Sequence, residues 1–121
     1  MSKVLCLTHR GVRCCVPAER VLTAEQAQAY EDAVDFWEGE PPGAQVLGER
    51  SLRLETADGP RWLWGSRVQA VSITANQIQK VSPVLQDLLT LPHVVGLAAL
   101  GEELVWLVEP LRFSKERVGA N

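Results

Sequence analysis

The chain has 121 residues, which suits one compact domain over residues 1–121 and is too short for two ordinary ones. Hydrophobic residues make up 46% of the sequence and charged residues 22%, so the chain can bury a core and global disorder is not expected. The formal net charge of −3 and the scattered basic residues argue against a nucleic-acid partner, because phosphate binding needs clustered Lys and Arg.

The sequence also argues against insertion into a membrane. Its apolar runs are all shorter than the roughly 18–20 residues that span a bilayer. The N-terminal segment is interrupted by His9, Arg10 and Arg13, and it lacks the apolar core of a secretory signal. We therefore expect a cytoplasmic protein, and a reducing compartment predicts that its three cysteines are free thiols buried on strands. These are Cys6, Cys14 and Cys15.

The first predicted element is a β-hairpin. Two apolar runs, Val4–Leu7 and Val12–Val16, flank a polar stretch that ends at Gly11, a residue suited to a tight turn. Pro17 follows and should end the second strand, because proline has no N–H to donate to a neighbouring strand.

The segment from Thr23 to Trp37 is predicted to form a helix. Its apolar residues recur at three- and four-residue spacing, which would make one buried stripe. They are Ala27, Tyr30, Val34 and Trp37. Thr23 can cap the start of this helix, while Gly39 and Pro41–Pro42 can end it. The acidic residues on its other faces form either a solvated surface or an acidic docking patch.

A second hairpin is predicted after the proline loop. Ser51–Glu55 alternates apolar and polar residues, Asp58–Gly59 offers a turn, and Arg61–Trp64 begins the return strand. Gly65–Ser66 should interrupt this strand. It resumes over Val68–Ile73, where the alternation slips between residues 70 and 71 and suggests a bulge or a sheet corner.

A short helix and a third hairpin complete the pattern. Pro83 stands at the preferred first position of a helix of about two turns that Pro92 limits. Val94–Leu100 and Leu104–Val108 are nearly all apolar, so this hairpin should be covered on both sides or line a small barrel. The predicted fold class is mainly β (α+β), with two short helices and a flexible tail at residues 113–121.

Motifs for catalysis, metals and cofactors are missing from the sequence. His9 and His93 lie at opposite ends of the chain without metal-ligand spacing, and the cysteines form no CxxC pair. There is no GxSxG, Walker-type or GxGxxG motif. We therefore predict that the protein is not an enzyme and uses no metal or cofactor.

Aromatic residues are the candidates for a partner-binding site. Trp62 and Trp64 share one face of a strand by their two-residue spacing, and they belong either to the core or to an interface. Phe36 and Trp37 stand beside acidic residues and the rigid Pro41–Pro42, a setting typical of an interface anchor. The predicted partner-binding residues are these four aromatic residues.

The ends of the chain resemble the CheW-like domain of bacterial chemosensory systems. Val12–Val21 has the shape of the family's opening, in which the second strand ends in a Pro-x-x-x-Val step. The family closes with a helical or extended segment, a glycine-containing apolar strand, a turn and a last strand. Here Ile78–Val84, Val94–Gly101 and Leu104–Glu109 follow that order. Arg61–Ile73 resembles a further stretch of the family.

This resemblance implies small SH3-like β-barrel subdomains and a non-catalytic adaptor. Such an adaptor links the cytoplasmic domain of a chemoreceptor to a CheA-type histidine kinase, or to another signalling partner, by protein contacts alone. The family's Asn-x-Arg-Gly turn is missing here and Thr23–Trp37 stands in its place, so binding to the receptor without binding to the kinase is expected. The alternative is a small β-barrel module that binds a ligand or regulates an enzyme outside chemotaxis.

Overall fold

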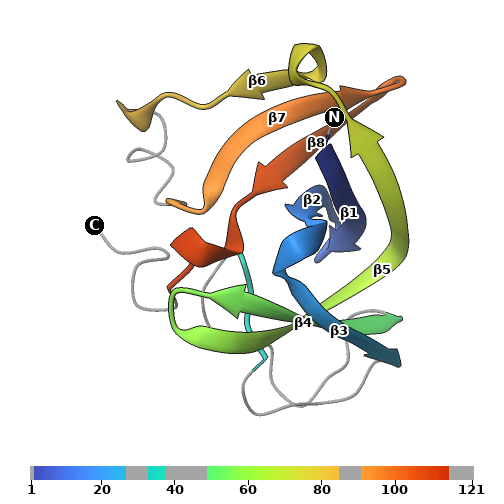
Figure 1. Cartoon of the computed structure of the whole chain (residues 1–121), viewed down its shortest axis with the longest axis vertical. Coiled ribbons are helices and arrows are strands. Elements are labelled where there is room, and N and C mark those ends of the chain that lie inside the picture. The colour runs from blue at the N-terminus through green and yellow to red at the C-terminus, as the bar shows by residue number, and fades with distance from the viewer. Residues whose placement is uncertain (1, 27–32, 38–48, 85–90, 115–121) are drawn as a thin grey trace.

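Eight β-strands form an open and strongly curved sheet (Figure 1). The computed structural model describes residues 2–26, 33–37, 49–84 and 91–114. The strands are β1 (Ser2–His9), β2 (Val12–Pro17), β3 (Val21–Gln26), β4 (Arg50–Thr56), β5 (Gly59–Ile73), β6 (Ile78–Lys80), β7 (Val94–Leu100) and β8 (Glu103–Val108). Three 3₁₀ turns join them, namely η1 (Ala18–Arg20), η2 (Ala75–Gln77) and η3 (Pro110–Arg112).

The order of the strands across the sheet is β3-β4-β5-β1-β2-β8-β7-β6. Strands β2 and β8 pair in parallel, and the other neighbouring pairs are antiparallel. The prediction of a mainly β fold is confirmed. The division into SH3-like barrels stays a prediction, because the described strands are ordered as one open sheet. No helix among the described residues is long and apolar enough to cross a membrane.

The N-terminal hairpin forms as predicted, and β2 ends at Pro17. Its turn consists of Arg10 and Gly11, whose φ angles of 50° and 80° are the positive values that a type I′ turn requires. This hairpin lies between two hydrophobic clusters. Leu7 and Cys14 face one cluster, and Cys6 and Cys15 face the other. Both faces of the hairpin are therefore buried, which explains why its strands are apolar throughout instead of alternating.

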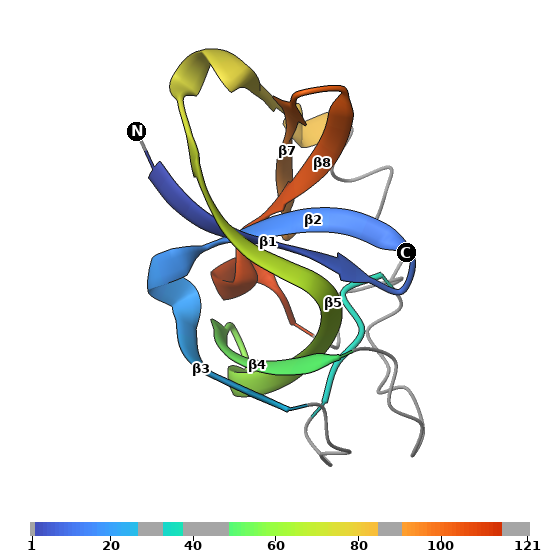
Figure 2. The same cartoon turned by 90° about the vertical axis from the view of Figure 1, so that its right-hand side faces the viewer.

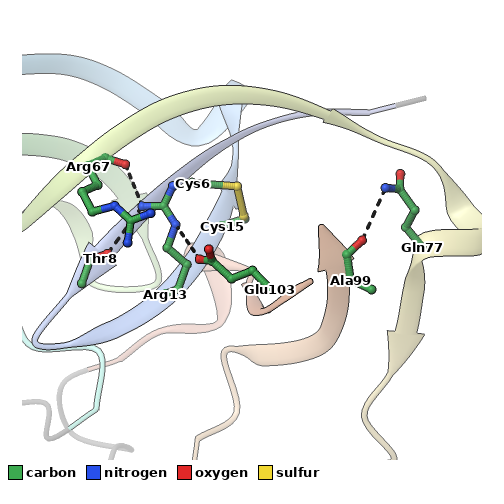
Figure 3. The surroundings of a disulfide bond; sticks show 8 residues. All are labelled: Cys6, Thr8, Arg13, Cys15, Arg67, Gln77, Ala99 and Glu103. Carbon is green, nitrogen blue, oxygen red and sulfur yellow. Dashed lines mark hydrogen bonds and ion pairs between the residues drawn. A yellow bond between two sulfur atoms is a disulfide. The ribbon is translucent and has the colours of Figure 1, made fainter. Parts of the chain in front are cut away.

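Two of the three cysteines form a disulfide, so the prediction of three free thiols is wrong. Figure 3 shows the bond between Cys6 on β1 and Cys15 on β2, which are direct partners in the antiparallel register. Their Cα atoms are 4.1 Å apart, as suits the closer, non-hydrogen-bonded kind of antiparallel pair. A two-residue turn at Arg10–Gly11 fixes this register, and it brings together cysteines that spacing motifs do not connect. Cys14 remains a free, buried thiol.

The prediction of a helix from Thr23 to Trp37 is wrong at both of its described ends. Residues 21–26 form β3, which pairs with β4, so Thr23 lies within a strand instead of capping a helix. Near the other end, Ala33 forms a parallel bridge with Trp62, and the N–H of Val34 donates to the Trp62 carbonyl at 2.9 Å. These contacts with residues far away in the sequence outweigh the helical spacing. Ala27 and Tyr30 lie outside the described residues.

The long strand β5 connects the two halves of the molecule (Figure 2). Its first part pairs with β4 and its second part with β1, and it runs through Gly65–Ser66 without the predicted interruption. The irregularity lies between Ser66 and Gln69 instead of at residues 70–71, and Arg67 there has a φ of 52°. Gly65 suits this close approach of the strands, because a Cβ at this position would press against the side chain of Leu7 on β1.

The C-terminal hairpin of β7 and β8 is also confirmed, but it is not covered on both sides. Buried and partly exposed residues alternate on β7, and Leu104 on β8 is 68% exposed. The predicted short helix starts at Pro83, and its residues 85–90 lie outside the described part. Phe113 and Ser114 are buried, and the Phe113 carbonyl accepts from the N–H of Ala57 at 3.0 Å. The rest of the predicted flexible tail lies outside the described residues, and the tail stays a prediction.

Candidate partner-binding surface

A hollow of about 610 Å³ opens where the N-terminal hairpin meets the C-terminal hairpin. We call it the Glu109 hollow. Its walls come from β1, β2, η1, the end of β5, β7 and β8, and they are mainly apolar. The lining residues are Ser2, Lys3, Val4, Cys15, Pro17, Ala18, Glu19, Ile73, Val95, Leu107, Val108 and Glu109. Beneath it lies the hydrophobic cluster that contains the disulfide.

An ion pair forms the polar wall of the Glu109 hollow. Both Nε and Nη2 of Arg20 lie 3.2 Å from Oε1 of Glu109. The second oxygen of Glu109, Oε2, is shielded from solvent and has no hydrogen-bond partner among the described residues. Oε1 of Glu19 lies 3.9 Å from Nη2 of Arg20. Two carboxylates thus share one guanidinium, and the group carries a net charge of −1.

A second hollow of about 420 Å³ adjoins the first, and we call it the Lys80 hollow. Val95 and Leu107 line both hollows, so the two form one apolar depression along the C-terminal hairpin. The remaining lining residues of the Lys80 hollow are Ile78, Lys80, Val81, Pro83 and Arg112. Among the described residues, the charged ones that line it are both basic, whereas Glu19 and Glu109 line the Glu109 hollow together with Lys3. A depression with an apolar centre and charged rims has the anatomy of a protein-binding surface.

Comparison with known proteins places this geometry in a known fold. No protein-family model and no curated protein sequence matches the chain. The structure is similar to the crystal structure of the scaffolding protein TtCheW from Thermoanaerobacter tengcongensis, with a TM-score of 0.61, 12% sequence identity and coverage of 99% of both chains.

The chain has a CheW-like fold. The resemblance found in the sequence is thereby confirmed at the level of the fold. A similarity in fold at 12% identity leaves the contact residues of this CheW-like chain to be argued from its own side chains.

Most of the aromatic residues predicted to bind a partner lie in the core of the CheW-like fold. Phe36 has no exposed surface, and Trp64 and Trp62 are only 2% and 7% exposed. Trp37 is partly exposed, and its Nε1 donates to the carbonyl of His9 at 2.8 Å. None of the four lines either hollow. Their burial suits a role in the core, while contact between Trp37 and a partner stays a prediction.

Two buried histidines hold the Phe36 segment in the centre of the CheW-like fold. Nδ1–H of His9 donates to the Trp64 carbonyl at 2.7 Å, which leaves Nε2 to accept from the N–H of Phe36 at 3.2 Å. His93 donates from Nε2 to the Phe36 carbonyl at 2.5 Å. These bonds fix opposite tautomers for the two rings. The Phe36 N–H is therefore satisfied by His9, and the Phe36 carbonyl is satisfied by His93.

A carboxylate completes this buried cluster. Oδ1 of Asp35 accepts from the N–H of Trp37 at 2.7 Å and lies 3.6 Å from Nε2 of His9, while Oδ2 is 2.8 Å from Nε of Arg10. The carboxylate is thus compensated by a guanidinium and a backbone donor, as a buried charge requires. The cluster anchors residues 33–37 against β1 and β5.

The protonation states of the buried groups suit a structural role. Burial lowers the pKa of His93 to about 4, although the hydrogen bond to Phe36 acts in the opposite direction. The ring is therefore neutral at pH 7. Burial raises the pKa of Cys14 to about 12, which keeps this thiol protonated and weakly nucleophilic. Neither residue lines a hollow, and the described residues contain no group of three or more potential metal ligands.

The two hollows have no direct signal in the sequence. Arg20 and Glu109 are 89 residues apart, and only the pairing of β2 with β8 brings their surroundings together. The Pro-x-x-x-Val step is an indirect signal for the Glu109 hollow. Pro17 ends β2 and the chain continues into η1, whose residues Ala18 and Glu19 line the hollow.

Proposed function

We propose that this chain is a non-catalytic adaptor in a bacterial chemosensory system, where it joins signalling proteins through contacts in the Glu109 and Lys80 hollows. The fold carries the proposal, because it matches a scaffolding protein over 99% of both chains. The apolar depression with charged rims supports it, since an adaptor acts by presenting such a surface.

The proposed partners are the cytoplasmic domain of a chemoreceptor and a CheA-type histidine kinase, which would place the chain in the cytoplasm. The missing Asn-x-Arg-Gly turn favours binding to the receptor without binding to the kinase. Trp37 is a further proposed contact, because it is the member of the predicted aromatic set that keeps exposed surface. Its truncation to alanine should then weaken receptor binding roughly 30-fold, the effect of a hot spot of about 2 kcal/mol.

A tyrosine placed in the Glu109 hollow tests whether this surface binds the partner. Ala18 is a partly exposed wall residue, so the side chain of Ala18→Tyr should fill the hollow without disturbing the core. Ala99→Tyr is the matched control, because Ala99 is exposed on β7 and lines neither hollow. Binding to purified receptor and kinase fragments from the same genome is measured by biolayer interferometry, with folding checked by circular dichroism.

We expect the wild-type protein and Ala99→Tyr to bind a receptor fragment equally, and Ala18→Tyr to bind at least about tenfold more weakly. Failure of the wild-type protein to bind either receptor or kinase would contradict the adaptor function. Equal binding by all three proteins would leave the adaptor function standing and contradict the hollow as its contact surface.

A small-ligand or enzyme-regulatory β-module is the second candidate function. It is favoured by the size of the Glu109 hollow, since about 610 Å³ falls within the range of sites for small molecules. The same experiment separates the two functions, because a ligand-binding module would bind neither fragment.

A further inference from the structure

The unpaired oxygen of Glu109 points to the chemistry of the partner. Arg20 places two N–H donors on Oε1 of Glu109 and none on Oε2. A shielded carboxylate oxygen without a donor is unfavourable, so a donor that reaches it from the hollow gains binding energy. Glu109 lines the hollow and its side chain is 23% exposed, so a donor can approach the carboxylate from the hollow.

The charge of this wall favours a donor that is a cation. Glu109 is the least exposed of the charged residues that line the hollow, with a side chain that is 23% exposed, and it stands among the apolar side chains of Ile73, Val95 and Leu107. Lys3 and Glu19 also line the hollow, but both are exposed, so water screens their charges and leaves the carboxylate of Glu109 as the group that a bound cation would meet. Charge-assisted hydrogen bonds to a carboxylate are the stronger kind, especially beside apolar walls.

We propose that the Glu109 hollow receives an apolar stretch of a partner protein that carries a lysine or arginine, whose N–H groups bind the carboxylate of Glu109. This inference rests on the proposed adaptor function and adds the chemistry of the partner segment. The aliphatic stem of the basic residue and its apolar neighbours would cover Val95 and Leu107, while the charged group meets Glu109.

Three small probes with the same six-carbon chain test the chemistry without any partner. Hexylammonium, hexanol and hexanoate are titrated into the full chain, and chemical-shift changes of Ala18, Val95 and Leu107 are followed by NMR. The Glu109→Gln variant keeps the size and one acceptor of the side chain but removes its charge. Glu103→Gln is the matched control, because Glu103 pairs with Arg13 at 3.2 Å and lines neither hollow.

We expect hexylammonium to bind the wild-type protein and Glu103→Gln more tightly than hexanol, and hexanoate to bind most weakly. In Glu109→Gln the preference for the ammonium group should fall about tenfold, as expected for loss of a hydrogen bond to a charged group. The proposal is overturned by equal binding of hexanoate and hexylammonium, by an unchanged preference in Glu109→Gln, or by no response at the hollow residues.

The source of the basic group is decided with the receptor and kinase fragments. A fragment that binds the wild-type protein should bind Glu109→Gln about tenfold more weakly and Glu103→Gln unchanged. If hexylammonium binds as expected but the fragment binds Glu109→Gln as tightly as the wild-type protein, the occupant is a free amine and the proposed partner segment is wrong. If no fragment binds at all, the adaptor function fails, whereas the probes still report whether Glu109 accepts a cation.

Discussion

The buried ring of His93 predicts a loss of stability in acid that a single substitution can isolate. His93 has no exposed surface, and its Nδ1 has no hydrogen-bond partner among the described residues. Protonation would therefore place a charge and an unsatisfied N–H in the core, beside the rings of Phe36 and Phe113 at 5.3 and 5.0 Å. The perturbation is a change of pH from 7 to 4, compared between wild type and His93→Gln.

The size of this loss follows from the two pKa values. The pKa of His93 is about 4 in the folded chain, against a reference value of 6.5. The unfolded chain binds more protons in the window between these values, so the free energy of unfolding falls as the pH falls from about 6.5 towards 4. At 1.36 kcal/mol per pH unit, the full loss is on the order of 3 kcal/mol.

Urea unfolding followed by tryptophan fluorescence measures the effect at several pH values. The remaining ionisable groups are common to both proteins, so the difference between wild type and His93→Gln isolates His93. This difference should change by about 3 kcal/mol in favour of the variant between pH 7 and 4. A difference that stays flat across this window would show that the imidazole is not kept neutral by burial, and the reasoning would be refuted.

Three further predictions concern the centre of the fold. Reduction of the Cys6–Cys15 disulfide should lower the free energy of unfolding by roughly 2–3 kcal/mol, the value expected for the short loop that it closes. Urea unfolding curves that are the same with and without reductant would contradict the bond. Gly65→Ala should cost about 1–3 kcal/mol by its clash with Leu7, and less in a Leu7→Ala background, as thermal unfolding of the double mutant will show. Trp37→Phe should cost about 1 kcal/mol in urea unfolding by losing its hydrogen bond to the backbone, and an unchanged midpoint would count against that bond.

The three hairpins were predictable because their signals are local. Gly11, Gly59 and Gly101 all have positive φ angles in the turns between paired strands, and the flanking runs are apolar or alternating. The similarity to the CheW-like domain was also readable, since it depends on the order of such strands, glycines and prolines along the chain.

The segment from Thr23 to Trp37 was mispredicted because its structure is decided by distant residues. Its helical spacing is real, yet the partners of its described parts are β4, Trp62 and the two histidines. Phe36 illustrates the consequence, because a residue predicted to bind a partner is fully buried between rings from both ends of the chain.

The candidate surface could not be predicted from sequence for a similar reason. Its walls combine residues from the first strand to the last, and its polar group joins Arg20 to Glu109 only after β2 and β8 pair. A register argument, in contrast, would have found the disulfide, since a two-residue turn at Arg10–Gly11 sets Cys6 opposite Cys15.

The most direct test of the central claim is an NMR titration of the ¹⁵N-labelled chain with a purified cytoplasmic fragment of a chemoreceptor from the same genome. The proposed adaptor surface predicts that the largest amide shifts fall on Lys3, Ala18, Val95 and Glu109, in the walls of the Glu109 hollow. Shifts confined to β3 and β4, or no shifts at saturating fragment, would contradict the claim that this hollow is where the protein binds its partner.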